Sequence, residues 1–486
     1  MIGGDLKVEK YRFRARPQNK HFVLFPADQT SHSISMFSVI ILLCKISLDT
    51  DPFFSYIDLN KCGIIEALIA IILVIILIQI SINLYIRCWF YGTAYNYENI
   101  WVCVFGSRAF QFIPTILNIL AYLTYVVWFT FEIHDNAATF LKVVWPNVPS
   151  FLTNKWFLSY IINLITVVPC LFVKRFSSLT WVACVGNIAM IISIVCLIIL
   201  LARNAHDLNF NVQIEKEATI EKDDFPYLPF TSLFSKNVGA FFYCIGSVMT
   251  AFYMHPMLDM VFSEMKNPTV CRCLSSTWIV GIISIVVFYG IGLISYFIIQ
   301  INLQDFIHVS NLISDGKLSI DATQFLNRPF NIFSFNLNGE VEELNNENVF
   351  FNFNTNHVEA LIGMVATYIV TLTTNMIYHY FLATQVSSLV IRRKQDDIPP
   401  LIISGVVVIL FCIGINFMDD TATEILDMIS IIAFCIMVFI LPPVFYLKLY
   451  RFTNVFWGAL SLFVLVIGIA LSVTVVYFNS KEISIK

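Results

Sequence analysis

Long apolar runs alternate with short polar segments along most of this chain. A helix that spans a membrane needs about 20 predominantly apolar residues. An apolar run at 34–48 is shorter than this, and ten runs of sufficient length follow it. These ten candidate spans lie at 63–86, 109–133, 157–173, 178–202, 238–263, 277–300, 359–391, 399–417, 423–446 and 454–478.

The first and the sixth of these eleven runs are interrupted. The first contains Lys45 and ends in the polar string 49–52, and the sixth loosens near Gly246 and carries His255-Pro256. Proline lacks an amide donor and clashes with the preceding turn, so regular helical bonding should fail at both places. Freed backbone groups at membrane depth are costly unless protein, water or a ligand bonds them. The pattern therefore predicts two discontinuous helices.

The composition places the chain in a membrane and argues against several other classes. Hydrophobic residues make up 58% of the 486 residues and charged residues 13%, about half the charged share of an average soluble protein. The net charge of -4 gives no reason to expect a nucleic-acid partner. The 12 cysteines fall mostly within apolar runs, and neither a disulfide framework nor a metal site is indicated. No cofactor is expected beyond a coupling sodium ion or proton.

Lysine and arginine are concentrated on the side of the basic N-terminal tail, even when the two long loops are left aside. This asymmetry predicts a cytoplasmic N-terminus and an extracytoplasmic C-terminus. The string FNIFSFNLNG in the second long loop alternates as a pair of short strands would. The expected organisation is a tail (1–33), a first five-helix repeat (34–202), a loop (203–237), a second five-helix repeat (238–446, with a loop at 301–358) and an eleventh helix with its tail (447–486).

The interrupted helices open the two five-helix halves of the chain. Matching breaks in two halves indicate a secondary transporter built of inverted repeats, with its site between the broken helices. Helix N-termini exposed at such a break attract a carboxylate, and freed carbonyls accept an ammonium group or a metal cation.

Residues 249–269, MTAFYMHPMLDMVFSEMKNPT, resemble the sixth-span signature of the amino acid/auxin permease family, and are most similar to its neutral amino acid transporters of the system A/N type. Weaker similarities follow in the same order as in the family, at Tyr97-Glu98, at 171–181 and at 371–381. The resemblance implies an all-α polytopic membrane protein with eleven helices, in a LeuT-like 5+5 inverted repeat plus one. It also implies alternating-access transport of amino acids, coupled to sodium or protons.

One departure from that family concerns the first span. Where the family carries Gly-x-Gly-Ile-Leu-x-Leu-Pro, this chain has residues 45–52, KISLDTDP, so the proline is kept and both glycines are replaced. Lys45 and Asp49 are four residues apart and would pair if the segment were helical. In one interpretation the Lys45 ammonium takes the place of sodium or of a substrate amine. In the other, the two residues form a structural pair or reach toward water.

The candidate site residues cluster at the two breaks and in the eighth span. Thr373 and Thr374 offer oxygens to a cation, although such side chains often bond only their own helix. Glu264 is expected to pair with nearby basic residues. The expected substrate-binding residues are Lys45, Ser47, Leu48, Asp49, Ser247, Thr250, Ala251 and Phe252; those coupling an ion are Lys45, Asp49, Thr373 and Thr374; and those with gating or structural roles are Pro52, His255 and Pro256.

Three other classes of protein fit the sequence less well than a transporter does. A nutrient sensor with a transporter-like fold stays open, and a channel is disfavoured because no selectivity-filter repeat occurs. An intramembrane enzyme would need a nucleophile and a base at one depth, and His134-Asp135 is the only suggestive pair. The expected partners are an amino acid and the lipid bilayer of a plasma, vacuolar or lysosomal membrane, and the oligomeric state is left open.

Overall fold

The computed structural model describes residues 34–49, 51–53, 55–92, 96–108, 110–145, 147–206, 233–234, 238–314, 333–335, 341–344, 358–391, 398–415 and 420–485. The helices are α1 (Met36–Ser47), α2 (Ser55–Cys62), α3 (Ile64–Gly92), α4 (Tyr97–Phe105), α5 (Ile113–Val144), α6 (Lys155–Leu171), α7 (Thr180–His206), α8 (Val238–Ala251), α9 (Leu258–Ser263), α10 (Val270–Ser314), α12 (Val358–Ile391), α13 (Ile398–Ile415), α14 (Asp420–Cys435), α15 (Leu441–Tyr450) and α16 (Val455–Ile485).

Short helical turns and one small sheet complete the described chain. The 3-10 turns are η2 (Asp51–Phe53), η3 (Ser150–Thr153), η4 (Phe176–Leu179) and η5 (His255–Met257), and η7 (Ile436–Ile440) is a π-helical turn that joins α14 to α15. Strands β1 (Phe333–Phe335) and β2 (Val341–Leu344) pair antiparallel, as the alternating loop sequence predicted. Most of the two long loops lies outside the described residues, and α10 continues to Ser314, into the segment expected to form the second loop.

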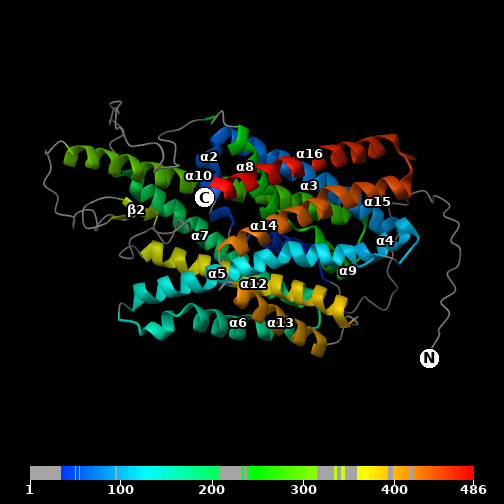
Figure 1. Ribbon diagram of the computed structural model, residues 1–486, viewed down its shortest axis with the longest axis horizontal. Coiled ribbons are helices and arrows are strands. Elements are labelled where there is room, and N and C mark those ends of the chain that lie inside the picture. Colours follow the sequence, from blue (N-terminus) through cyan, green and yellow to red (C-terminus); the bar gives the residue numbers. More distant parts are fainter. Residues whose placement is uncertain are drawn as a thin grey trace.

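Nine helical segments in the described part of the chain are long and apolar enough to cross a membrane, and α1 and α6 are shorter apolar helices. These eleven segments coincide with the eleven predicted runs. The first is short because it is half of a broken span, continued by η2 and α2. The helices run mostly along the long axis of the molecule (Figure 1). The prediction of an all-α polytopic membrane protein is confirmed.

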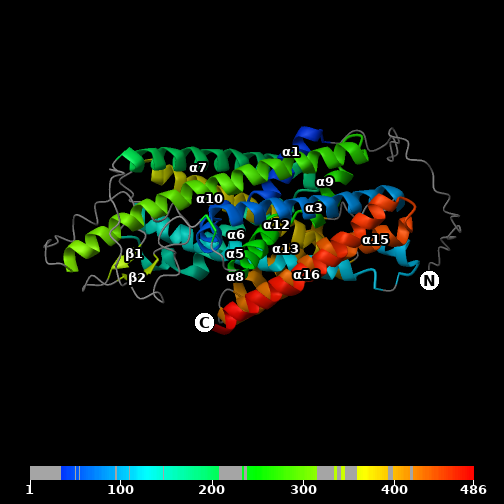
Figure 2. The same ribbon diagram turned by 90° about the horizontal axis from the view of Figure 1, so that it is seen from above.

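The packing of the helices reveals an internal symmetry. The second span, α3, packs on α8 of the sixth span, and the seventh span, α10, packs in return on α1 and α2 of the first. The third span, α5, packs on α14 of the tenth, and the eighth, α12, packs in return on α7, the fifth. Figure 2 shows α10 beside α7 and α1. Because each half has five spans, the second half starts from the opposite side of the membrane, which makes the repeat an inverted one.

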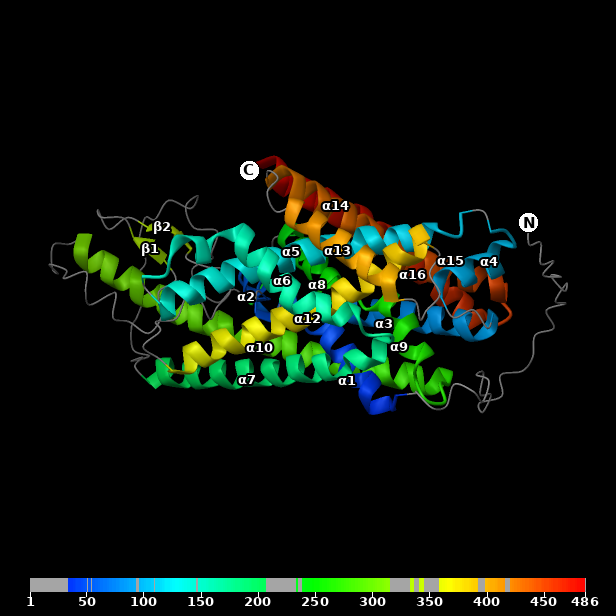
Figure 3. The ribbon, with the colours of Figure 1, turned by 90° about the horizontal axis from the view of Figure 1, so that it is seen from below.

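The eleventh span lies outside this symmetric pair. Only 22% of its most apolar window is buried, against 61% in α12, which lies at the centre of the bundle. In Figure 3 α16 lies along α14 and α15 at one margin of the molecule. The membrane spans of the described chain thus form a first set of five, a second set of five and one peripheral span.

The outer ends of the two broken spans are tied together. Ile34, just before α1, donates its amide to Glu264 O at 2.9 Å and accepts one from Lys266 N at 2.9 Å. The Glu264 carboxylate accepts the amides of Phe176 and Ser177 at 3.2 and 2.9 Å. The expected pairing of Glu264 with basic residues is not found among the described contacts: its oxygens bond the amides at the start of η4, where a helical turn leaves donors without partners.

Replacing Glu264 with alanine should destabilise the protein by about 1–3 kcal/mol, because two amides of η4 lose a charged acceptor. Thermal unfolding in detergent measures this effect. Glu264→Gln keeps one acceptor oxygen and should retain part of the stability. Equal melting temperatures for wild type and Glu264→Ala would contradict the assigned role.

Candidate functional site

Both predicted discontinuities are present. In the first span α1 ends at Ser47, Leu48 has φ -122° and ψ 75°, and helical structure returns at η2 with Pro52. In the sixth span α8 ends at Ala251, and η5 with Pro256 precedes α9. The helices break here because a proline cannot donate to the preceding turn.

Three tyrosines on neighbouring helices bond carbonyl groups at the two breaks. Tyr378 of α12 donates to Ile46 O at 2.8 Å, at the end of α1. Tyr125 and Tyr122 of α5 donate to Thr250 O at 2.6 Å and to Tyr253 O at 2.7 Å, at the end of α8. The hydroxyls replace donors that a continuous helix would supply, so each break is held open by another helix.

Lys45 lies at the junction of α1 with α7 and α12. Its side chain is 1% exposed, and Nζ donates to Thr374 Oγ1 in a short hydrogen bond and to Leu48 O at 3.5 Å. A methyl group at Gly186 of α7 would lie 2.6 Å from Lys45 Cε and 2.4 Å from Thr373 Oγ1, so the glycine lets these two side chains approach α7 closely. The direct Lys45–Asp49 pair is not formed among the described contacts, because α1 ends before Asp49 and the helical spacing of four no longer holds.

Two carboxylates of the first span are tied into its break. Asp49 Oδ1 accepts the amide of Asp51 at 3.0 Å, which caps the start of η2. Asp58 of α2 accepts a hydrogen bond from Ser247 of α8 at 2.8 Å. This last bond connects the two broken spans directly. Neither Asp51 nor Asp58 was among the residues predicted from the sequence.

The other substrate-binding candidates divide between the breaks and the neighbouring helix α10. Leu48 and Ala251 are buried at the ends of α1 and α8, and Thr250 bonds Ser247 O at 2.8 Å. Two candidates instead contact α10: Ser47 Oγ lies 2.8 Å from Ser284 Oγ, and the ring of Phe252 lies 5.4 Å from that of Phe288.

The ion-coupling candidates of the eighth span contact their own backbone. Thr373 Oγ1 donates to Ile369 O at 2.8 Å and Thr374 Oγ1 to Val370 O at 2.9 Å. Thr374 Oγ1 also accepts a hydrogen bond from the Lys45 ammonium, so its oxygen contacts a cation that belongs to the chain itself.

His255 contacts other spans at the second break. It is fully buried, and its Nε2 lies 3.2 Å from Ser81 Oγ of α3. Ser81 in turn donates a short hydrogen bond to Val438 O in η7. The sixth, second and tenth spans are thus joined by one chain of polar groups, and Pro256 lies buried beside it.

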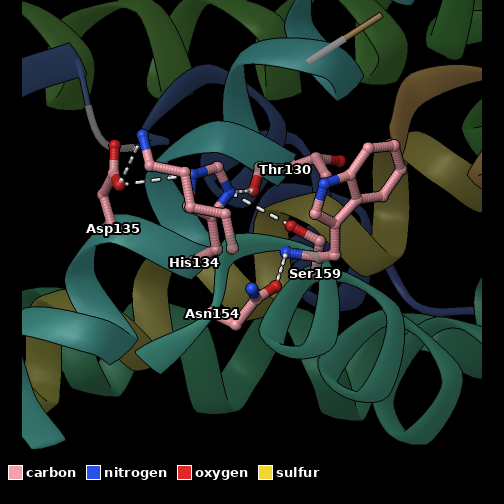
Figure 4. Close-up of polar contacts among 7 residues, drawn as sticks. Thr130, His134, Asp135, Asn154 and Ser159 are labelled. Atoms are coloured by element: carbon pink, nitrogen blue, oxygen red, sulfur yellow. Dashed lines mark hydrogen bonds and ion pairs between the residues drawn. The ribbon is translucent and has the colours of Figure 1, made fainter. Parts of the chain in front are cut away.

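His134 and Asp135 do meet a serine in space (Figure 4). His134 Nδ1 lies 3.0 Å from Thr130 O and 3.1 Å from Ser159 Oγ, and Nε2 lies 3.2 Å from Asp135 Oδ1. The Thr130 carbonyl and the Asp135 carboxylate both only accept, so a proton on Nδ1 suits the first and a proton on Nε2 suits the second. These contacts join α5 to α6.

Five helices repeated in inverted order, each half opening with a broken helix, define the LeuT-like class of membrane protein. Among solved structures the chain is similar to Mhp1, a nucleobase-cation-symport-1 family transporter, in a closed conformation with bromovinylhydantoin bound. The identity is 12%, the TM-score is 0.48, and the match covers 94% of this chain and 93% of that one. No family model matches the chain. No curated protein matches its sequence.

Removing the hydroxyl of Tyr125 should destabilise the protein by about 0.5–1.5 kcal/mol, since Thr250 O would lose this donor and keep the amide of Tyr253 at 3.2 Å. Tyr125→Phe changes one oxygen atom only, and thermal unfolding in detergent reports the loss. Tyr160→Phe is the matched control, because Tyr160 is 49% exposed. If both variants have the melting temperature of the wild type, the Tyr125 hydroxyl does not stabilise the break.

Proposed function

We propose that this protein is a secondary active transporter that moves a small solute across a membrane by alternating access. The observation that carries the proposal is the meeting of two broken helices, one from each inverted half, through the Asp58–Ser247 hydrogen bond. Broken helices in corresponding positions are where such transporters bind substrate and coupling ion. Amino acids are the proposed substrate class, on the resemblance of residues 249–269 to the amino acid/auxin permeases.

Lys45, Asp49, Thr373 and Thr374 are proposed to couple transport to an ion. The buried Lys45 ammonium contacts Thr374, so a positive charge of the chain occupies a place where a sodium ion would need oxygens. A fixed ammonium there makes sodium unnecessary and favours coupling to protons. An ionisable residue within a membrane is a functional hypothesis by default, because burying it is costly.

The breaks themselves supply the means of opening and closing. The hydroxyls of Tyr122, Tyr125 and Tyr378 bond carbonyl groups of a different span. When α5 or α12 moves against the broken spans, these hydrogen bonds are replaced by bonds to the solute. Pro52, His255 and Pro256 are proposed to fix the places where the broken spans bend.

The orientation and location are proposed from the charge pattern. The basic tail lies in the cytoplasm and the C-terminus outside it, in a plasma, vacuolar or lysosomal membrane. The domain boundaries remain those of the sequence, with two five-helix repeats and an eleventh helix. A transporter-like sensor is the second candidate, favoured by the replacement of both first-span glycines.

Exchange assays in reconstituted vesicles distinguish a transporter from a sensor. Saturable uptake of a labelled amino acid, stimulated by unlabelled solute on the opposite side, is expected for a transporter. A screen over the twenty amino acids, with and without sodium and at two pH values, identifies both solute and ion. Binding without any exchange would support the sensor instead.

Replacing Lys45 with methionine should change the ion dependence of uptake. Without the ammonium, Thr373 and Thr374 are free to contact a solvent cation, so uptake should lose pH dependence and gain sodium dependence. The measurement is initial uptake rate against pH and sodium concentration. Lys448→Met is the control, because Lys448 is exposed. Unchanged ion dependence at normal protein yield would contradict the coupling role.

A further inference from the structure

Four carboxyl groups gather around the first break, opposite one buried lysine. Asp49, Asp58 and Glu132 all lie within electrostatic range of Asp51. Asp49 and Glu132 also lie within range of Lys45. Glu132 reaches this group from α5, whereas the three aspartates belong to the broken first span. We name Asp49, Asp51, Asp58 and Glu132 the carboxyl cluster.

The hydrogen bonds that the structure describes for the cluster have neutral donors, and two lysines, Lys45 and Lys61, lie near it. Asp58 accepts from Ser247 and is also near Lys61, whose ammonium lies 4.0 Å over the Tyr243 ring. Glu132 accepts from Thr371 at 3.2 Å and Asn136 at 3.4 Å, both neutral donors. Lys45, the other cation near the cluster, directs its hydrogen bonds to Thr374 and Leu48 O.

One oxygen of the cluster points to a ligand directly. Asp49 is 1% exposed: its Oδ1 is bonded to Asp51 N, its Oδ2 has no donor at hydrogen-bond distance, and the Tyr378 hydroxyl, which donates to Ile46 O, lies near the carboxyl group. A buried carboxylate oxygen without a donor is costly, and a charged donor removes that cost. Within the described residues no three histidine, cysteine or acidic side chains converge as metal ligands do. The carboxyl groups instead extend along the break from residue 49 to residue 58.

We infer that the carboxyl cluster binds an ammonium or guanidinium group of the solute, and that this protein carries cationic amines rather than neutral amino acids. The inference rests on the proposed transport function and names its substrate class. An ammonium group donates three hydrogen bonds, so it can bond Asp49 Oδ2 and the neighbouring Asp51 carboxylate at the same time. Two sources supply this chemistry: a cationic amino acid, whose carboxylate would face Lys45, and a diamine.

A matched set of three solutes tests the inference. Free lysine and cadaverine share a carbon chain and a terminal ammonium, and differ by the α-carboxylate. Norleucine keeps the amino acid part and lacks the terminal ammonium. The full chain in vesicles should exchange lysine or cadaverine with an apparent affinity at least about tenfold higher than that for norleucine, as one charged hydrogen bond is worth. Whichever of lysine and cadaverine has the higher apparent affinity identifies the substrate class, a cationic amino acid or a diamine.

Asp49→Asn separates charge from shape. It should weaken uptake of the preferred cationic solute about tenfold or more relative to uptake of norleucine by the same variant. Asp427→Asn, at an exposed aspartate of α14, should behave as the wild type. Ligand-induced thermal stabilisation in detergent, with the same three solutes, provides a readout that does not depend on transport.

The outcomes separate this inference from the transporter proposal. Exchange of norleucine equal to that of lysine and cadaverine overturns the cationic substrate while transport stands. An effect of Asp49→Asn on sodium dependence alone also overturns it, in favour of an inorganic cation. Stabilisation by lysine or cadaverine without any exchange supports the cationic ligand and overturns transport. Neither stabilisation nor exchange by lysine or cadaverine overturns the inference outright.

Discussion

Backbone carbonyl groups that lose their helical partners inside a bilayer must find other donors, and this requirement organises the centre of the structure. Ile46, Thr250 and Tyr253 have carbonyl groups at the ends of α1 and α8, and only Thr250 O among them has a described main-chain donor there, the Tyr253 amide at 3.2 Å. Tyrosine hydroxyls from α12 and α5 bond all three. The breaks are therefore stable only while four helices, two from each inverted half, keep their mutual positions.

The same hydrogen bonds are of a kind that can be exchanged. A tyrosine hydroxyl at a carbonyl can be replaced by another donor of similar reach, and a solute ammonium is such a donor. Asp58 and Ser247 join the broken spans, while His255 and Ser81 join the sixth span to the second and tenth. These bonds link each break to helices of both halves.

Electrostatics distinguish this break from one lined only by main-chain atoms. The first span brings Lys45, Asp49, Asp51 and Asp58 to one region, and α5 adds Glu132. The lysine donates its short hydrogen bond to Thr374 of the eighth span, while Asp49 and Glu132 lie within electrostatic range of its ammonium. Both features follow from ending α1 at Ser47, which separates Lys45 from Asp49.

The sequence by itself determined the class of the protein, because lipid imposes a rule that composition reveals: apolar runs of spanning length must be helices, and polar or proline-bearing interruptions must be breaks. It therefore located eleven spans, the two breaks, and Lys45 and Asp49 beside one of them. It did not reveal Tyr122, Tyr125 and Tyr378 as donors, although the first two lie three apart in one apolar span. Nor did it reveal the bonds of Glu264 to Phe176 and Ser177. Those partners are far away in the chain, and only the packing of α5, α12 and η4 against the broken spans decides which carbonyl or amide each side chain reaches.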